Sequence, residues 1–170
     1  MAYLIVVMGV SGSGKTHVGR WLGNAVGYEF VDGDDLHPPE NITRMKNGEQ
    51  LDDAARRPWL AAIVRRAETA VAKGDSLIVA CSALKQSYRD QLRSIAVPVY
   101  FVFLEGSQQL IETRLENREG HFMPSKLLQS QFEDLQRPNG EKGVVSVDID
   151  QSAESVCLEV LACLQTLIAE

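Results

Sequence analysis

A run of eight residues near the N-terminus, GVSGSGKT at positions 9–16, limits the possible folds of this chain more than any other feature. An apolar segment, residues 3–8, precedes it, and a stretch with helical spacing of apolar residues follows it. The pattern G-x-x-x-x-G-K-[ST] between a strand and a helix is typical of a phosphate-binding loop. Because glycine tolerates a positive φ and has no Cβ, Gly9, Gly12 and Gly14 let the backbone turn tightly and aim its N–H groups at a phosphate.

The residue types inside this loop predict how a nucleoside triphosphate would be held. The start of the following helix adds the positive end of its dipole. We expect Lys15 to reach the β- and γ-phosphates as a point charge, and the Thr16 hydroxyl to bind the Mg²⁺ ion that bridges the same oxygens. A glycine-rich turn without a ligand is the alternative. The residues predicted to bind ATP are Gly9, Val10, Ser11, Gly12, Ser13, Gly14, Lys15 and Thr16.

The rest of the chain alternates short apolar runs with longer stretches of helical period. This alternation predicts an α/β fold in which a parallel sheet is covered by helices on both faces. We expect one helix to end at Gly27, and another to run from Pro58 to Gly74. The expected strands are residues 3–8, 29–31, 76–81, 99–104 and 144–149.

Length and composition narrow the class of protein. A chain of 170 residues with 45% hydrophobic content is expected to form a single domain over residues 1–170. Its formal charge of −6 does not supply the dense basic face that nucleic-acid binding needs. No apolar run approaches the ~20 residues of a membrane span, and no charged leader precedes the first strand, which favours a cytoplasmic protein without a membrane partner. The three cysteines lack paired spacing and are expected to be buried apolar residues.

Acidic residues follow the second expected strand, in VDGDDLHP at positions 31–38. In an open parallel sheet, ligands bind at the carboxyl ends of the strands. A carboxylate there can accept the proton of an attacking hydroxyl or hold Mg²⁺, and Asp34, further out than Asp32, is the expected base and a candidate metal ligand. The alternative is that these acids cap the next helix. His37 is either a substrate contact or a structural hydrogen-bonding group.

Two further sites are candidates for binding the acceptor substrate. Arg56 and Arg57 precede the helix expected at Pro58, where a guanidinium can grip a carboxylate in bidentate fashion or form an ordinary salt bridge. The Ser82 hydroxyl, at the carboxyl end of the third strand, would face the same crevice. No acidic residue closely follows that strand, so the second carboxylate for magnesium is assigned to Asp34.

A later segment has the pattern of a lid. Arg114 and Arg118 lie four residues apart in a helical stretch, which GHFMP at residues 120–124 then interrupts. We expect a lid over approximately residues 119–137. Because phosphoryl transfer needs positive charge on the transferred group and exclusion of water, Arg118 is a candidate catalytic residue. Ordinary exposed helix arginines are the alternative.

Taken together, these motifs resemble the gluconate kinase (gluconokinase) family, which is related to shikimate kinase and the nucleoside monophosphate kinases. The similarity extends over essentially the whole chain. The phosphate-binding loop is common to many families, whereas DGDDLHP, CSALK with YRD, and GHFMP in this order are specific to this one. The chain departs from the family in the acidic run before its PWL segment, where Ala54 and Ala55 stand.

The resemblance implies ATP-dependent phosphorylation of the 6-hydroxyl of D-gluconate, with Mg²⁺ as cofactor, on a three-layer P-loop fold with a five-stranded parallel sheet and a helical lid. A homodimer is compatible with it. Kinases for idonate or shikimate are the alternatives within the enzyme class, and a module that binds ATP without turnover is the alternative outside it. The predicted catalytic residues are Lys15, Asp34 and Arg118, and the predicted substrate-binding residues are Asp34, His37, Arg56, Ser82 and His121.

Overall fold

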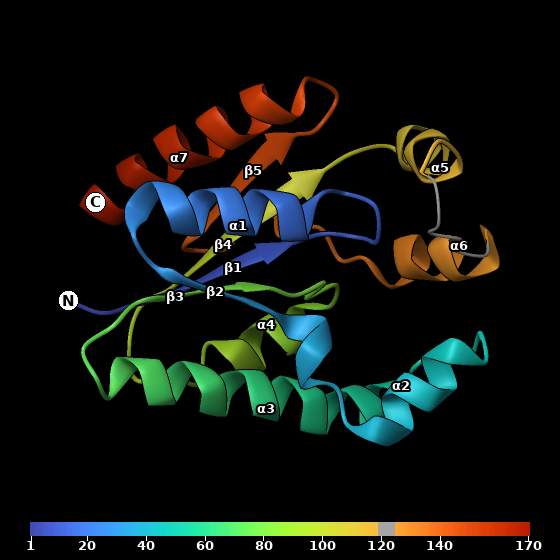
Figure 1. Cartoon of the computed structure of the whole chain (residues 1–170), viewed down its shortest axis with the longest axis horizontal. Helices are drawn as coiled ribbons and strands as arrows, with labels where there is room; N and C mark the ends of the chain where they lie inside the picture. The colour runs from blue at the N-terminus through green and yellow to red at the C-terminus, as the bar shows by residue number, and fades with distance from the viewer. Residues whose placement is uncertain (119–124) are drawn as a thin grey trace.

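One five-stranded sheet organises the computed structural model, which describes residues 1–118 and 125–170 (Figure 1). All four pairs of neighbouring strands are parallel. The strands are β1 (Leu4–Met8), β2 (Glu29–Asp32), β3 (Leu77–Ala80), β4 (Val99–Glu105) and β5 (Val144–Asp148), in the order β2-β3-β1-β4-β5. The helices are α1 (Lys15–Val26), the short 3-10 helix η1 (Gly33–Leu36), α2 (Pro39–Lys46), α3 (Asp53–Val71), α4 (Gln86–Leu92), α5 (Gln108–Glu116), α6 (Ser125–Asp134) and α7 (Ala153–Ala169).

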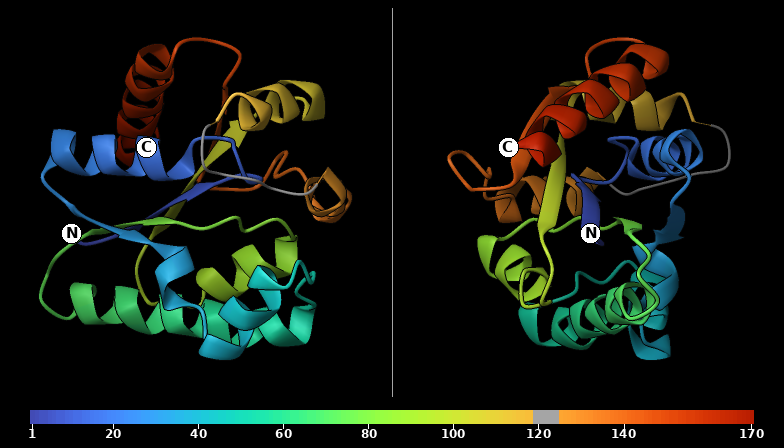
Figure 2. Two further views of the ribbon diagram at one scale, coloured as in Figure 1. Left: turned by 45° about the vertical axis from the view of Figure 1, so that its right-hand side comes forward. Right: turned by 90° about the vertical axis from the view of Figure 1, so that its left-hand side faces the viewer.

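Helices cover both faces of the sheet, as Figures 1 and 2 show. Side chains of α3 and α4 pack with one face in a first buried cluster, and side chains of α1, α5 and α7 pack with the other face in a second. The predicted α/β fold with a five-stranded parallel sheet between helical layers is therefore confirmed. In the ranges that the structure describes, no helix is both long and apolar enough to cross a lipid bilayer.

The strand order places β1 next to β3, and the chain leaves these two strands toward opposite faces. After β1 it enters α1, and after β3 it enters α4. Such a divergence opens a crevice at the carboxyl ends of the strands. Two main-chain hydrogen bonds join the walls of this crevice: Gly9 N–H donates to the Ser82 carbonyl at 3.3 Å, and Cys81 N–H donates to the Val7 carbonyl at 3.0 Å.

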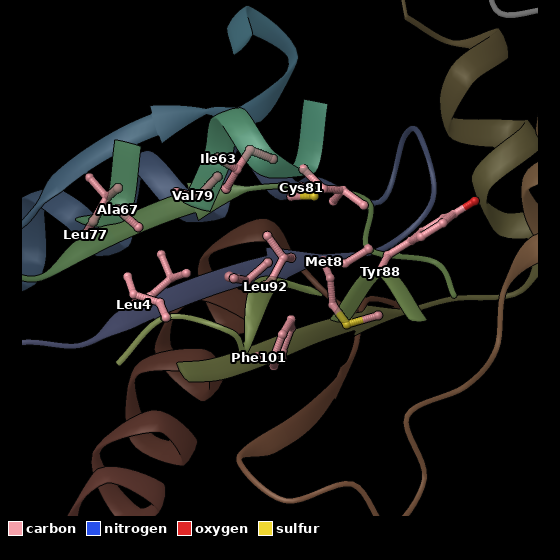
Figure 3. Close-up of a cluster of buried hydrophobic side chains, with 14 of the residues drawn as sticks. Leu4, Met8, Ile63, Ala67, Leu77, Val79, Cys81, Tyr88, Leu92 and Phe101 are labelled. Atoms are coloured by element: carbon pink, nitrogen blue, oxygen red, sulfur yellow. The ribbon is translucent and has the colours of Figure 1, made fainter. Parts of the chain in front are cut away.

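The first buried cluster fixes the strands that carry this crevice (Figure 3). Leu4, Leu77 and Ile63 come from β1, β3 and α3 and are fully buried. Burial of one such side chain contributes about 1.5–3 kcal/mol, so the cluster strongly opposes displacement of α3 from the sheet. Tyr88 lies at the edge of the cluster, with its hydroxyl oxygen directed out of it.

Of the three cysteines, Cys81 and Cys157 are buried and Cys163 is partly exposed.

The helix expected from Pro58 begins earlier, so that expectation is wrong at its start. Helix α3 begins at Asp53, because the Asp52 side chain accepts the Ala55 N–H at 2.8 Å and caps the first turn. Pro58 lies in the second turn, where its missing N–H removes one bond of the ladder and leaves the helix continuous. Arg56 is therefore inside the helix, and its direction is set by α3. The expectation for α1 is confirmed, since Gly27 ends it at φ 75°.

Arg89 of α4 is a fully buried charge that holds two segments beside the crevice. It donates to the carbonyls of Ala83 at 2.8 Å, Leu84 at 3.1 Å and Gln136 at 2.9 Å. Its guanidinium also binds both carboxylate oxygens of Glu141. Ala83 is buried with φ 46°, a left-handed conformation that is unfavourable for a residue with a Cβ. Arg89 thus fixes the strained loop after β3 to the segment that follows α6.

Substitution Arg89→Met is expected to lower the free energy of unfolding by about 3–5 kcal/mol, because it leaves the carboxylate and several carbonyls without their buried partner. Arg93→Met is the matched comparison, since the partly exposed Arg93 binds the same Glu141. That variant should lose about 1 kcal/mol or less. Urea unfolding of the two variants measures the difference. Equal losses would show that the buried position of Arg89 carries no special weight.

Candidate active site

The loop after β1 has the backbone of a phosphate cradle. Gly9, Gly12 and Gly14 have φ values of 151°, 82° and 98°. A Cβ on Gly9 would lie 2.6 Å from the Ser13 hydroxyl oxygen, and one on Gly12 would lie 2.9 Å from the Leu115 side chain. A Cβ on Gly14 would meet nothing within 4 Å, so the space beside it is open to a ligand. The left-handed conformation and the open space together favour an anion at the start of α1.

The side chains of Ser13 and Lys15 in this loop make few hydrogen bonds within the protein. The Ser13 hydroxyl is buried and has no hydrogen-bond partner in the described part of the chain. The Lys15 ammonium donates to the Val10 carbonyl at 3.1 Å. Burial lowers the pKa of Lys15, and the negative charge of Asp34 is the largest of the effects that oppose this shift. The negative charge of a phosphate would stabilise the ammonium form of Lys15, which burial disfavours.

Asp32, at the end of β2, joins the loop to the acidic segment. One of its carboxylate oxygens accepts the Thr16 hydroxyl at 2.9 Å, and the other accepts the Asp34 N–H at 3.0 Å. Asp32 therefore caps η1 and also binds the hydroxyl predicted to hold Mg²⁺. The expectation named Thr16 and Asp34 for the metal, and it missed this pairing. Its signal was present, since Asp32 is the last residue of the strand.

The structure answers the alternative that the acidic residues after β2 cap the next helix. Helix α2 has Pro38 at its N-cap position, with no side-chain cap. Asp34 and Asp35 therefore do not cap it. Burial raises the pKa of Asp34, the charges of Asp32 and Asp35 raise it further, and Lys15 opposes the shift. A carboxylate with a raised pKa beside a lysine is well suited to accept a proton from a hydroxyl.

His37 has the surroundings of a structural residue. Its ring stacks on Trp59 with 4.2 Å between ring centroids, and its Nδ1 lies 3.3 Å from the Asn41 side-chain nitrogen. The Trp59 indole N–H donates to the Gly33 carbonyl at 2.7 Å, which ties the acidic segment to α3. Burial lowers the pKa of His37 to about 4, and the charge of Arg56 adds to this shift. A contact between His37 and the substrate stays a prediction.

A pocket of about 320 Å³ lies between the N-terminal end of α3, the segment after β3 and α6, and we call it the acceptor pocket. Arg56 donates from Nη1 to the Tyr88 hydroxyl at 3.0 Å and to Asp134 at 3.2 Å. Lys85 donates to Asp53 at 2.9 Å, and the Tyr88 hydroxyl donates to the same carboxylate oxygen. Both bonds lower the pKa of Asp53, and the bond from Tyr88 has the larger effect. The residues lining the acceptor pocket are Gln50, Leu51, Asp52, Asp53, Arg56, Lys85 and Asp134.

Charges from three elements converge at the end of β3. Burial raises the pKa of the Cys81 thiol to about 12, and the charges of Lys15, Asp34 and Arg56 all act on this thiol. Ser82 follows directly, half-buried, with its carbonyl bound to the loop through Gly9. The three charges that act on this thiol belong to the predicted nucleotide-binding lysine, the predicted base and one predicted substrate-binding arginine.

Other candidates are not part of this cluster. Arg118 is exposed just beyond the end of α5, where its N–H donates to the Leu115 carbonyl at 3.2 Å. His121 and the rest of the GHFMP motif lie outside the described residues, as does the first part of the predicted lid. Arg57 is exposed and does not line the acceptor pocket. Lys85, Tyr88 and Asp134 were not predicted, although the first two belong to the CSALKQSYRD motif.

A second pocket, of about 160 Å³, lies on the other side of the phosphate-binding loop. Arg114 of α5 borders it and donates to the carbonyls of Ile149 and Gln151, which follow β5. Arg114 is therefore held at this pocket and not beside the acceptor pocket. Its lining combines apolar residues with a few polar ones, which is typical of pockets for small molecules. The lining residues are Ser13, Gly14, His17, Val18, Arg114, Ile149, Gln151, Ala153 and Val156.

Comparison with known proteins identifies relatives over nearly the whole chain. A family model described as an AAA domain matches residues 4–138. A gluconokinase of Gluconobacter oxydans is 42% identical over 161 residues, covering 95% of this chain and 90% of the relative. The crystal structure of a gluconokinase from Sinorhizobium meliloti has 51% identity and a TM-score of 0.89, covering 96% of this chain and 91% of that one. A shikimate kinase from Aquifex aeolicus, at 18% identity and a TM-score of 0.62 over 96% of each chain, shares the fold.

The lowered pKa of His37 predicts a loss of stability in mild acid. The ring is neutral in the folded protein down to about pH 4, whereas its ordinary pKa is 6.5. The unfolded chain therefore takes up a proton first as the pH falls, and the folded state loses at most about 3 kcal/mol between pH 6.5 and pH 4. His37→Phe keeps a ring for Trp59 and cannot titrate. The stability of the wild type relative to this variant should fall over that window, and an NMR titration that put the His37 pKa near 6.5 would contradict the assignment.

Proposed function

Because the chain belongs to the gluconokinase family, we propose that it is an ATP-dependent kinase that phosphorylates the 6-hydroxyl of D-gluconate. One observation carries this proposal: the end of β3 is joined to the phosphate-binding loop by the 3.3 Å bond from Gly9 N–H to the Ser82 carbonyl, and Lys85, three residues further on, lines the acceptor pocket. That place lies between an open phosphate cradle and a pocket that contains two cations. A kinase for a small anionic acceptor needs both parts side by side.

The nucleotide would lie along the loop after β1. Its phosphates would receive the loop N–H groups and the Lys15 ammonium, and its base would enter the second pocket beside Arg114. The Thr16 hydroxyl and the Asp32 carboxylate, 2.9 Å apart, form an oxygen donor pair that suits Mg²⁺, with Asp34 as a further candidate. The metal would neutralise charge on the β- and γ-phosphate oxygens.

The acceptor pocket suits a substrate with a carboxylate. Arg56 and Lys85 already bind carboxylates of the protein, those of Asp134 and Asp53, and a gluconate carboxylate offers them the same kind of partner. The 6-hydroxyl oxygen then forms a bond to the γ-phosphorus, the bond to the β-phosphate oxygen breaks, and Asp34 accepts the hydroxyl proton. Arg118 is proposed to approach the transferred phosphoryl group.

The alternatives are less well supported. The shikimate kinase comparison, at 18% identity, shows a shared fold and nothing about the acceptor. A module that only senses ATP would not need the linked Arg56, Tyr88 and Asp53 beside the loop. The idonate kinase alternative differs only in stereochemistry at the acceptor.

A coupled ADP-release assay tests the proposed function directly. The acceptors are gluconate, idonate, shikimate, a nucleoside monophosphate and the neutral polyol sorbitol. Gluconate should give the highest kcat/KM, by at least roughly tenfold, because Arg56 and Lys85 favour a carboxylate at the far end of a linear acceptor. ATP binding without ADP release for any acceptor would favour the sensing module.

Arg56→Gln supplies the control for this assay. Loss of the guanidinium should raise KM for gluconate by roughly tenfold to a hundredfold and change the activity with sorbitol much less. Arg65→Gln, an exposed arginine of the same helix, should match the wild type. An equal loss for gluconate and sorbitol would mean that Arg56 supports the fold of the pocket and does not bind the carboxylate.

The role of Asp34 as base gives a sharper variant. Asp34→Asn should lower kcat by a factor on the order of 10² to 10⁴ while KM for ATP changes little. Asp35→Asn removes a neighbouring exposed carboxylate and should change kcat by less than about tenfold. In the wild type, kcat should fall with decreasing pH through the raised pKa of Asp34. Near-normal turnover in Asp34→Asn would show that Asp34 is not the base, and Asp32 would then be the next candidate.

A further inference from the structure

Helix α6 contacts the phosphate-binding loop through one side chain. Ser11 N–H donates to the side-chain oxygen of Gln131 at 2.7 Å, although the two residues are 120 positions apart. Figures 1 and 2 show α6 close to the loop that follows β1. Because a main-chain N–H needs an acceptor, the amide oxygen of Gln131, and not its nitrogen, lies at Ser11. The contact therefore has a defined polarity.

The N–H groups of the loop fall into two sets. Those of Gly9, Ser11 and Ser13 are bound by the protein itself, through the Ser82 carbonyl, Gln131 and the Val10 carbonyl. A second set has no acceptor in the described part of the chain and remains for phosphate oxygens. Ser11 thus belongs to the set that shapes the loop and not to the set that receives the ligand. The N–H groups of the second set are those of Val10, Gly12, Gly14, Lys15 and Thr16.

Helix α6 is itself held both by a buried side chain and by the residues that follow its C-terminal end. Leu128 is buried in the second cluster, and the N–H of Gln136 donates to the Leu84 carbonyl at 2.8 Å. Asp134 binds Arg56 of the acceptor pocket at 3.2 Å. Gln131 and Asp134 are three positions apart and share one side of the helix. One rigid element therefore contacts the loop and the acceptor pocket at the same time.

We propose that Gln131 is a positioning residue for phosphoryl transfer. It fixes the Ser11 peptide from α6, and with Asp134 it sets the separation between the phosphate-binding loop and the acceptor pocket. This inference rests on the proposed function. In-line transfer needs reacting atoms about 3–3.5 Å apart, and a misplacement of about 1 Å can lower the rate roughly a hundredfold. A loop freed from Gln131 should therefore lose kcat more than substrate affinity.

The test compares two substitutions of Gln131 and one control. Gln131→Met keeps the length of the side chain and removes the acceptor, whereas Gln131→Glu keeps an acceptor oxygen. The control is Gln129→Met, since the exposed Gln129 bonds only Glu133 of its own helix at 3.1 Å. Hydrogen exchange of the Ser11 amide is measured in nucleotide-free protein, and kcat and both KM values are measured with gluconate and ATP.

Gln131→Met should accelerate exchange at Ser11 by at least roughly fivefold and lower kcat by roughly tenfold to a hundredfold, with KM for gluconate within about threefold of the wild type. Gln131→Glu should keep the Ser11 amide protected, and Gln129→Met should match the wild type in every measurement. Unchanged Ser11 exchange or unchanged kcat in Gln131→Met would overturn the proposal, as would equal exchange in the Met and Glu variants. The exchange measurement needs no acceptor, so it remains decisive for this contact even if gluconate proves not to be the substrate.

Discussion

Main-chain N–H groups without an acceptor are the constraint on which the rest of this structure depends. The loop after β1 has left-handed glycines and leads directly into the first turn of α1, and five of its N–H groups have no acceptor in the described part of the chain. Phosphate oxygens are suitable acceptors for such a set of donors, and the space beside Gly14 is open to them. The burial of Lys15, which lowers its pKa, has the same consequence for charge. The hydrogen bonding and the charge of the loop are thus left for an anionic ligand to satisfy.

The acceptor pocket differs from the phosphate-binding loop, because its charged side chains are already paired with one another. Arg56 and Lys85 are bound to Asp134 and Asp53, and Tyr88 links the two pairs. Paired charges keep the pocket ordered when it is empty, yet an anionic substrate must compete with internal carboxylates for the same cations. The pocket can therefore discriminate by charge and geometry more than by raw affinity.

The sequence predicted the parts of the structure that local chemistry determines. The glycine pattern, the strand alternation and the cap at Gly27 are properties of short segments, and the loop, the sheet and the end of α1 agree with them. The start of α3 was missed because Pro58 was taken as the first helical residue, whereas Asp52 caps the helix earlier in the chain. The Thr16–Asp32 pair was missed for another reason: residues from α1 and β2 meet only when the sheet assembles.

Long-range contacts account for the rest. Nothing in a linear pattern places Gln131 at Ser11 or Asp134 at Arg56, because both contacts depend on how the segment after α5 returns to the sheet. The structure likewise places Arg114, which the sequence paired with Arg118 just before the predicted lid, at the second pocket, where it binds carbonyls that follow β5. The gluconate assignment came from motif order and was supported by relatives, since pocket shape alone does not distinguish one aldonic acid from another.

The conformation of Ala83 gives the wall of the crevice an unusual property. A left-handed alanine is disfavoured by roughly 1 kcal/mol, and Arg89 holds it in place by binding its carbonyl and the next one. The backbone after the third strand is therefore held in a strained conformation by a buried guanidinium that lines neither pocket. Substitutions that relax this backbone and raise thermal stability would therefore also change the shape of the crevice at the candidate active site.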